Sequence, residues 1–481
     1  MDTRRLLSTT LLYGIADVVV LAVGGFALLP LYTRTLSQAG FGTYVIVRTN
    51  IEILTYLLYL GLPSAVARLY FDHRKTGLHI EYMSSVLTFF GLVLVVWCVL
   101  LYGWGESLWA LLSPSTPAAP YLGYALAITA TGFFSAIGTL WLRLEGRVAI
   151  FSALQVGTSF VLAAAAIVNL AFLHRGLPGL LSALLVSSAF SALILPWLIG
   201  RRFRLAIHWP HIAQSLRYAL PIMLGYIAYF VLNRISTLIL QRHVEVEQMA
   251  IFGLAQQLAM MLTIAAAAFG KATQPAVFAA EAHYADELLV RSGRILMRIM
   301  FTLTAALLLF ASELFSLVAP ASYSSGHGVL LILLVASFAY SFNLISDTAL
   351  LFHRRPKTSV AISTAGALLS VGLGMWLIPR YQLYGAALAI GAAFFVMALL
   401  GQSLARRLTG ISYLRPMLSA LGAACALAGF AAWLGALGLD LPVAIGVKLG
   451  VAALFLGALH RHDIRRLVVR FSEKHSKPCL P

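Results

Sequence analysis

Ionisable and aromatic side chains recur at helical spacing inside apolar segments of this chain. One such segment carries Tyr44, Arg48, Glu52 and Tyr56 at intervals of four residues, which places them on one face of a helix. A charged side chain at the centre of a bilayer costs about 2.5–3.5 kcal/mol on insertion scales, so such a face lines water or protein rather than acyl chains. The stripe predicts a polar surface within a membrane span.

Similar polar stripes occur in later apolar segments. Their members in the second half of the chain are Tyr229, Asn233, Arg234, Gln256, Lys271 and Asp347. The first apolar segment adds Asp17, which could serve helix packing or proton coupling. Polar stripes edged with tyrosine in both halves are typical of a central hydrated cavity between two lobes.

Each of these charges also has a structural alternative. Arg48 and Glu52 could simply neutralise each other, because they lie four residues apart. Arg234 lies near the end of its segment and could snorkel to the interface. Lys271 lies at a helix end where topology alone explains a cation. Lys448, a lone cation in the last apolar segment, is interpreted as a snorkelling residue.

The composition identifies lipid as the solvent of most of the chain. Hydrophobic residues make up 60% of the 481 positions and charged residues only 11%, whereas soluble domains carry about 25% charged residues. A membrane span needs about 20 apolar residues. We expect about fourteen spans, near residues 9–32, 43–66, 81–104, 119–142, 151–173, 178–199, 218–240, 248–270, 295–319, 328–351, 358–378, 383–405, 415–437 and 441–459.

The fold class predicted from this pattern is an all-α integral membrane protein. Six helices form each of two lobes around a central cavity, and two further helices follow. The expected organisation is an N-lobe over 1–200, a C-lobe over 201–410, the thirteenth and fourteenth spans over 411–460, and a basic cytoplasmic tail over 461–481. An echo between Phe41-Gly42-Thr43-Tyr44 and Met249-Ala250-Ile251-Phe252-Gly253 indicates that the lobes are parallel repeats.

The 34 lysines and arginines, against 17 acids, predict the topology. Most of them fall in alternate loops and in the tail, as the positive-inside rule requires when both termini are cytoplasmic. The positive charge also favours the anionic lipid of the inner leaflet. A nucleic-acid partner is therefore not expected.

Motifs of enzymatic chemistry are absent from the sequence. There is no HExxH or GxSxG pattern, and Gly270-Lys271-Ala272-Thr273 fails as a phosphate loop because position 265 is Ala. The three cysteines are isolated and have no metal-ligand spacing. We expect a transporter that is not an enzyme, with no metal site and no cofactor beyond a coupling proton or sodium ion.

Several motifs resemble those of one transporter family. The first-half motifs are LPLYTRTL at 29–36, FGTY at 41–44 and GLPSA at 61–65, and the second half runs from Leu220-Pro221 through Asn233-Arg234 to Pro275 and Phe278. They resemble the polysaccharide-biosynthesis branch of the multidrug, oligosaccharidyl-lipid and polysaccharide exporter superfamily. Many relatives carry an acid where this chain has Asn233.

This resemblance implies a flippase of the bacterial inner membrane. Such proteins carry undecaprenyl-pyrophosphate-linked oligosaccharides to the outer face for surface polysaccharides such as O-antigen or exopolysaccharide, beside polymerase or glycosyltransferase partners. Guanidinium groups bind phosphate in a bidentate manner, so Arg48 and Arg234 are the leading ligands. The tyrosines would stack on sugars, the amides would bond hydroxyls, and Asp17, Glu52 and Asp347 are candidate coupling acids.

Three other functions stay open from the sequence. A cation-coupled multidrug or metabolite antiporter of the same superfamily would use Asp17 as its coupling acid. A membrane-embedded transferase of envelope assembly would need catalytic carboxylates on loops, and the outside segment 103–120 holds a single acid, Glu106. A flippase for a peptidoglycan precursor is a close variant of the main hypothesis.

Overall fold

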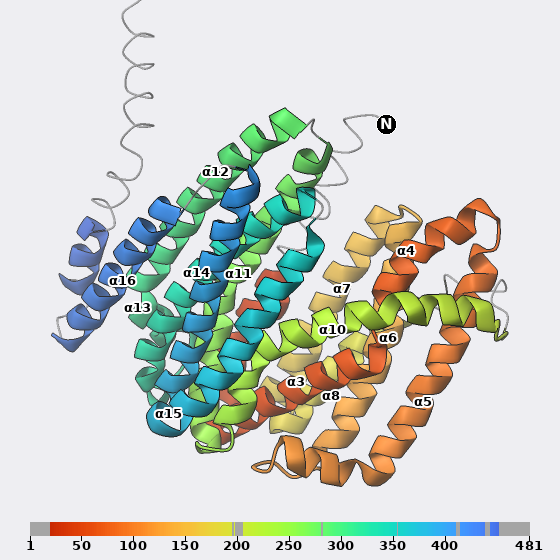
Figure 1. Ribbon diagram of the computed structural model, residues 1–481. Helices are drawn as coiled ribbons and strands as arrows, with labels where there is room; N and C mark the ends of the chain where they lie inside the picture. The colour runs from red at the N-terminus through yellow and green to blue at the C-terminus, as the bar shows by residue number, and fades with distance from the viewer. Residues whose placement is uncertain are drawn as a thin grey trace, which may run out of the picture. The chain divides into compact units, whose positions relative to one another are not determined.

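The computed structural model describes residues 20–194, 197, 205–279, 282–353, 355–409, 414–437 and 443–451, and it contains helices but no strands within them. In chain order, the helices are η1 (Val20–Ala27), α2 (Leu29–Thr35), α3 (Gln38–Tyr59), α4 (Leu62–Lys75), α5 (His79–Leu112), α6 (Tyr121–Leu144), α7 (Val148–Ile167), η2 (Val168–Phe172), α8 (Gly176–Ala192), α10 (Trp209–Leu240), α11 (Val246–Ala279), α12 (Ala282–Leu309), α13 (Ala311–Val318), η4 (Ala321–Gly326), α14 (His327–Phe352), α15 (Pro356–Thr409) and α16 (Leu414–Ala436) (Figure 1).

The all-α membrane architecture expected from the sequence is confirmed. Among the described residues, nine helical stretches are long and apolar enough to cross a membrane, and two shorter apolar helices lie over Gly176–Ala192 and Tyr226–Leu240. Each of these nine stretches overlaps at least one predicted span, and Pro356–Arg407 overlaps two. Residues 9–19 of the first predicted span and residues 441–442 and 452–459 of the last one lie outside the described residues, so the count of fourteen stays a prediction.

The predicted span 43–66 consists of two helices joined by a bend. Its helical structure begins at Gln38 and is interrupted after Tyr59, where Leu60 and Gly61 have φ of 48° and 70°. A residue in the left-handed region ends an α-helix, and glycine adopts that conformation without steric cost. The separate helix α4 then begins with Pro63 in its first turn, where proline is well tolerated.

Two other boundaries differ from the sequence prediction. Helix α5 continues to Leu112 instead of ending near 104, because the glycines at 103 and 105 are no barrier to a long apolar helix. Helix α15 contains two predicted spans, and its helical backbone is broken at Gln382, where φ is 48°. Both predicted boundaries were based on weak turn signals in the sequence.

The chain forms two compact units, which are interleaved along the sequence. The first comprises Met1–Leu258, Leu317–Gly326 and Val360–Ala393, and the second comprises Ala259–Ser316, His327–Ser359 and Phe394–Pro481. The division of the chain into lobes at 200 and 410 stays a prediction, and each unit is described here on its own.

Glycines bring α3 and the start of α11 into close contact within the first unit. A Cβ on Gly42 would lie 1.9 Å from the carbonyl oxygen of Val246, and a Cβ on Gly253 would lie 2.3 Å from a methyl group of Val45. Small residues allow such backbone approach between membrane helices. The two glycines belong to the two segments whose sequences echo each other.

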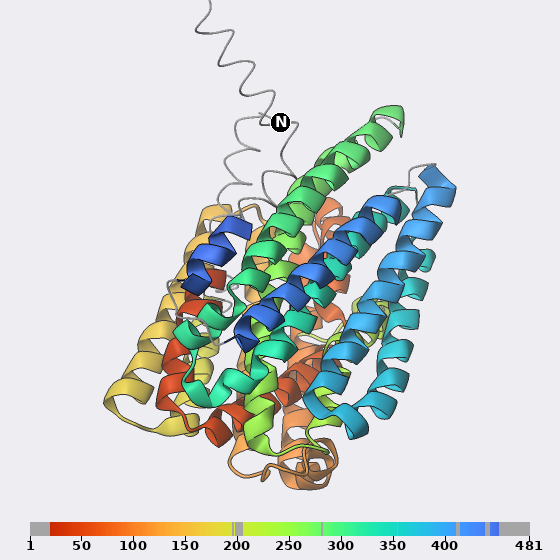
Figure 2. The same ribbon diagram turned by 90° about the vertical axis from the view of Figure 1, so that its left-hand side faces the viewer.

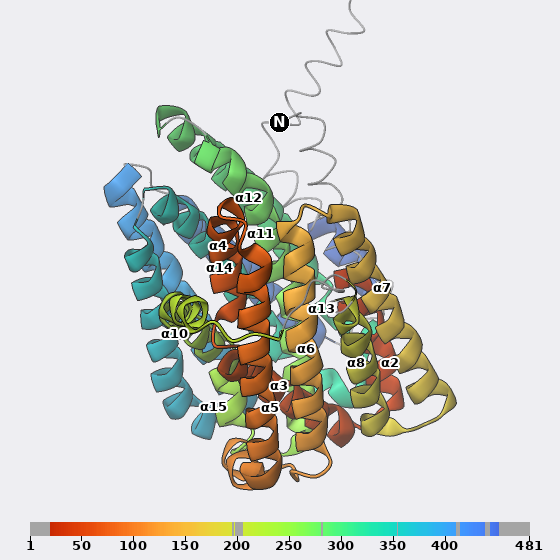
Figure 3. The ribbon, with the colours of Figure 1, turned by 90° about the vertical axis from the view of Figure 1, so that its right-hand side faces the viewer.

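Helix α10 packs against α3, α4 and α5 in the same unit, and Figure 3 shows this side of it, with α5 and α6 running alongside each other. Histidines join three of these helices where α10 begins. His73 of α4 stacks on Tyr82 of α5 at 4.4 Å between ring centroids. His211 of α10 lies 3.6 Å from Glu81, and burial lowers the pKa of His211. These side chains therefore pack together where α4, α5 and α10 meet.

Polar side chains link different helices within the second unit. Lys448 donates hydrogen bonds to both carboxylate oxygens of Glu313, at 2.6 and 2.8 Å, and only 5% of the Lys448 side chain is exposed. Gln402 donates to the carbonyl of Phe342 at 3.1 Å and to Ser346 at 2.9 Å. The interpretation of Lys448 as a snorkelling residue is wrong, because its buried ammonium is paired with the carboxylate of Glu313.

We predict that Gly42→Ala strongly destabilises the protein, because its new methyl group would overlap a backbone carbonyl that cannot move independently. Overpacking of this kind costs roughly 1–3 kcal/mol or more. Gly91→Ala is the matched control, because Gly91 lies in α5 with no atom within 4 Å of its Cβ position, and helix propensity there favours alanine by about 1 kcal/mol. Thermal unfolding midpoints of the purified variants test this. Equal midpoints for both variants would contradict the close packing of α3 and α11.

Candidate functional site

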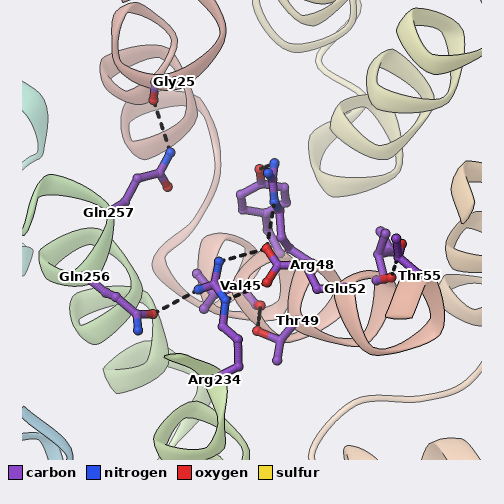
Figure 4. A network of polar contacts seen from close by, with 11 residues as sticks. Gly25, Val45, Arg48, Thr49, Glu52, Thr55, Arg234, Gln256 and Gln257 are labelled. Atoms are coloured by element: carbon purple, nitrogen blue, oxygen red, sulfur yellow. Dashed lines mark hydrogen bonds and ion pairs between the residues drawn. The ribbon is translucent and has the colours of Figure 1, made fainter. Parts of the chain in front are cut away.

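Arg234 of α10 binds Glu52 of α3 through two parallel hydrogen bonds. Its Nε donates to Oε2 at 2.6 Å and its Nη2 donates to Oε1 at 2.8 Å (Figure 4). This paired geometry is the strongest form of an arginine–carboxylate contact. The two side chains are 17% and 26% exposed, so the pair is well sheltered. Arg234 does not snorkel away from the helix bundle, and that alternative is wrong.

Gln256 of α11 binds the remaining nitrogen of the same guanidinium, Nη1. Its Oε1 accepts a hydrogen bond from Arg234 Nη1 at 3.1 Å, and its Nε2 donates to the backbone carbonyl of Asn233 at 3.1 Å. The amide thus links α11 to α10 and fixes the plane of the Arg234 guanidinium. The glycine contacts between α3 and α11 make this arrangement possible, because they bring Gln256 and Glu52 to the same guanidinium from two helices.

Arg48 faces the same carboxylate from one turn earlier on α3. Its Nε lies 3.8 Å from Glu52 Oε1, and its Nη1 donates to the hydroxyl of Tyr44 at 3.3 Å. The Arg48–Glu52 distance is long, so the main partner of Glu52 is Arg234 rather than Arg48. Half of the Arg48 side chain, 51%, is exposed. An arginine exposed within a span indicates a wet face, because exposure to acyl chains would be costly.

The site carries a net charge of plus one. Two guanidiniums converge on a single carboxylate, so the positive charge is only half neutralised within the cluster. Arg48 lies 10 residues after Gln38, where α3 begins, which corresponds to about 15 Å along the helix axis.

The two tyrosines on the stripe of α3 pack against other aromatic rings. Tyr44 is 4% exposed and lies beside Tyr32, with ring centroids 6.0 Å apart. Tyr56 stacks with Tyr226 at 6.2 Å and contacts Phe230 at 5.7 Å. These contacts fix the rings on the same helix face as Arg48. Their expected role in stacking on sugars stays a prediction.

The remaining predicted site residues lie apart from this cluster or outside the described residues. Asp17 is not among the described residues, and the side chains of Lys271 and Tyr229 are not described either. Asp347 lies in the second unit, where Ser359 donates a hydrogen bond to its carboxylate. Its role as a coupling acid stays a prediction.

One pair that sequence reasoning missed is Glu313 with Lys448 in the second unit. Glu313 accepts from Lys448 and also from its neighbour Ser312, at 2.9 Å. The available signal was a single acid and a single base in two otherwise apolar segments, since buried charges in membranes pair with each other.

Comparison with known proteins places the chain in a family. The sequence profile of the family described as polysaccharide biosynthesis protein matches residues 11–281, which is more than half of the chain. The chain therefore belongs to the polysaccharide biosynthesis protein family. No protein of curated function matches the chain.

Solved structures show the same fold. An inward closed conformation of the lipid II flippase MurJ is similar with a TM-score of 0.72 and 11% identity, covering 95% of this chain and 100% of that one. An inward-facing multidrug resistance MATE family transporter has a TM-score of 0.63 and 19% identity, covering 83% and 94% of the two chains.

A transporter of the MOP superfamily from Pyrococcus furiosus, in which a binding pocket of reversed polarity suggests a different function, has a TM-score of 0.52 and 18% identity, covering 84% and 95%. At these identities the likeness establishes the transporter fold and leaves the substrate open. The chain is a multi-pass membrane protein with the fold that MurJ and MATE transporters share.

We predict that Glu52→Gln lowers the thermal stability of the protein, because it leaves two guanidiniums facing each other without a counter-charge. Breaking a well-buried pair costs about 3–5 kcal/mol, and the partial exposure of Arg48 reduces the expected loss to about 1–3 kcal/mol. Asp72→Asn is the control. It breaks the exposed pair with Arg68, whose nitrogen lies 3.1 Å from the carboxylate, and such pairs contribute about 0–1 kcal/mol. An equal loss of thermal stability in both variants would contradict the conclusion that Glu52 neutralises buried charge in the cluster.

Proposed function

We propose that the chain is a flippase that moves undecaprenyl-pyrophosphate-linked oligosaccharides from the cytoplasmic to the outer face of the bacterial inner membrane. The observation that carries this proposal is the convergence of Arg48 and Arg234, from α3 and α10, on one carboxylate within membrane-spanning helices. Membership of a polysaccharide biosynthesis family supports an oligosaccharide substrate. The MurJ fold supports a lipid carrier.

The chemistry of the carrier explains why two arginines would be needed. A pyrophosphate carries at least two negative charges and cannot cross hydrocarbon unaccompanied. Two guanidiniums provide two positive charges and several hydrogen-bond donors in a planar geometry that matches phosphate oxygens. The cluster in its described form has a net charge of plus one, so it must gain one positive charge to match the pyrophosphate.

Glu52 supplies that change by leaving Arg234. It binds the guanidinium through the same two-pronged contact that a phosphate would make, so carboxylate and phosphate compete for one group. When the pyrophosphate arrives, or when Glu52 takes up a proton, Arg234 becomes free to bind the substrate. When Glu52 returns to Arg234, the substrate is released. Glu52 thus occupies the phosphate-binding groups of Arg234 when no substrate is bound, and it is also the leading coupling acid.

The other predicted residues have supporting roles in this mechanism. Gln256 and Asn233 position Arg234, and Tyr44 positions Arg48. Tyr56 and Tyr229 are proposed to contact sugar rings, and Lys271 to contact the pyrophosphate on its way in. Asp17 and Asp347 are proposed as further coupling acids for protons or sodium. No nucleotide is required, because ion gradients or consumption of the product outside can provide the energy.

This proposal includes a location and a set of partners. Both termini lie in the cytoplasm, the anionic inner leaflet faces the basic loops, and polymerases or glycosyltransferases act before and after translocation. A drug antiporter for organic cations is disfavoured by the excess of guanidinium over carboxylate in the cluster. A peptidoglycan-precursor flippase would use the same charge arrangement.

We predict that Arg48→Ala and Arg234→Ala each reduce export of surface polysaccharide at least tenfold in a strain that lacks the chromosomal gene. Arg68→Ala is the control, because Arg68 is exposed on α4 and pairs only with Asp72 among the contacts described. Immunoblots of membranes confirm that the three variants are present at equal levels. Full export by both site variants would contradict the proposed function.

We also predict that Glu52→Gln separates binding from transport. Removal of the competing carboxylate raises the affinity of the purified protein for undecaprenyl diphosphate by roughly tenfold, equivalent to about 1.4 kcal/mol. Export falls in the same variant, because the release step has lost its competing charge. An unchanged or weaker affinity for the diphosphate would show that Glu52 does not compete with the substrate.

A further inference from the structure

Three arginines form a stripe along the first half of α12, in the second unit. Arg291, Arg294 and Arg298 are spaced three and four residues apart, and all three are exposed. At 100° per residue they lie within an arc of about 60° on the helix surface. The face is therefore a compact row of guanidiniums, hereafter the arginine stripe.

The arginine stripe lies at the start of the apolar helical stretch Glu287–Leu309, before its long uncharged part. The segment that follows it, 299–318, contains Glu313 as its single charged residue, and its length is about the 20 residues that a span needs. Glu313 is neutralised by Lys448. Arg298 is the last charged residue before this segment, and Arg294 and Arg291 lie about 6 and 10 Å from it toward the start of α12. Figure 2 shows the first turns of α12 extending past the end of α16.

An exposed apolar strip runs beside the arginine stripe. Ile295 and Ile299 are each 43% exposed and Leu303 is 38% exposed, and they occupy the adjacent arc of the helix surface. The opposite arc, with Leu296 and Met300, is buried on a helix that packs against α14 and α16. The helix therefore has three faces, one against protein, one for acyl chains and one cationic.

We propose that the arginine stripe binds the phosphates of anionic phospholipids, such as phosphatidylglycerol, in the leaflet at this end of α12. A guanidinium binds a phosphate through two parallel hydrogen bonds. The three arginines are about one helical turn apart, so together they can contact headgroups over about 10 Å along the helix. The neighbouring apolar strip receives the acyl chains of the same lipids. This combination of faces fits a lipid and does not fit a soluble anion or an acidic protein.

Topology alone does not account for the alignment. The positive-inside rule depends on how many lysines and arginines lie near a helix end, and it is indifferent to the face they occupy. Glu287, one turn before Arg291 on the same side, is the single described acid on this face, and it leaves the row with a net positive charge. The stripe is independent of the Arg48 and Arg234 cluster, which lies in the other unit.

The test is a titration of the purified full-length protein in neutral detergent with phosphatidylglycerol, read out as the rise in its thermal unfolding midpoint. Each basic residue near an anionic surface contributes a factor of roughly five in affinity. The triple variant Arg291→Gln, Arg294→Gln and Arg298→Gln is expected to bind phosphatidylglycerol roughly 10- to 100-fold more weakly. The triple lysine variant keeps the charge for topology and is expected to lose less.

Controls separate the stripe from a general charge effect. The variant Arg217→Gln, Arg406→Gln and Arg407→Gln removes the same charge from exposed positions outside α12, and it should lose much less affinity for phosphatidylglycerol than the α12 glutamine triple, because its arginines do not form one row. Phosphatidylcholine and inorganic phosphate should leave all midpoints unchanged. Equal phosphatidylglycerol binding by the two glutamine triples, or equal protection by inorganic phosphate, would overturn the proposal. The outcome does not depend on polysaccharide export, which tests the other site.

Discussion

The structure depends on one electrostatic constraint, which is that a guanidinium inside a membrane span must have a partner. Arg234 satisfies it with the carboxylate of Glu52 and the amide of Gln256. Arg48 satisfies it in part with Tyr44, and half of its surface stays exposed. Because two arginines share one acid, the cluster is stable without substrate and still has an unmet preference for an anion. A flippase needs both properties, since it must stay folded without substrate and must also bind a charged carrier.

Helix packing determines whether this cluster can form at all. Its residues come from α3 and from the consecutive helices α10 and α11, which lie far from α3 in the sequence. Gly42 and Gly253 allow α3 and α11 to approach until backbone meets backbone. Gly61 follows Leu60 at the bend between α3 and α4, and it lies so close to α10 that a Cβ there would be 2.8 Å from the carbonyl oxygen of Ala219. Small residues in these helices therefore have a functional consequence, because they set the distance between Glu52 and Arg234.

The sequence predicts the helices well because hydropathy and charge asymmetry are local properties. It also predicts that Tyr44, Arg48 and Glu52 share a face, since that follows from helical periodicity. The choice of partner could not be predicted, because Glu52 has Arg48 four residues away and binds Arg234 from another helix instead. The partner of Lys448 could not be predicted from the sequence either. A lone cation in an apolar segment looks like a snorkelling residue until Glu313 is known to lie beside it. Helix ends, such as that of α5, were missed where turn residues do not interrupt an apolar helix.

The central claim is that Arg48 and Arg234 act together on the two phosphates of the carrier. The most direct measurement is the ratio of the affinities of the purified protein for undecaprenyl diphosphate and undecaprenyl monophosphate. The account predicts that the unchanged protein prefers the diphosphate and that Arg48→Gln and Arg234→Gln each reduce this preference. The same preference in all three proteins would contradict it, because neither arginine would then distinguish two phosphates from one.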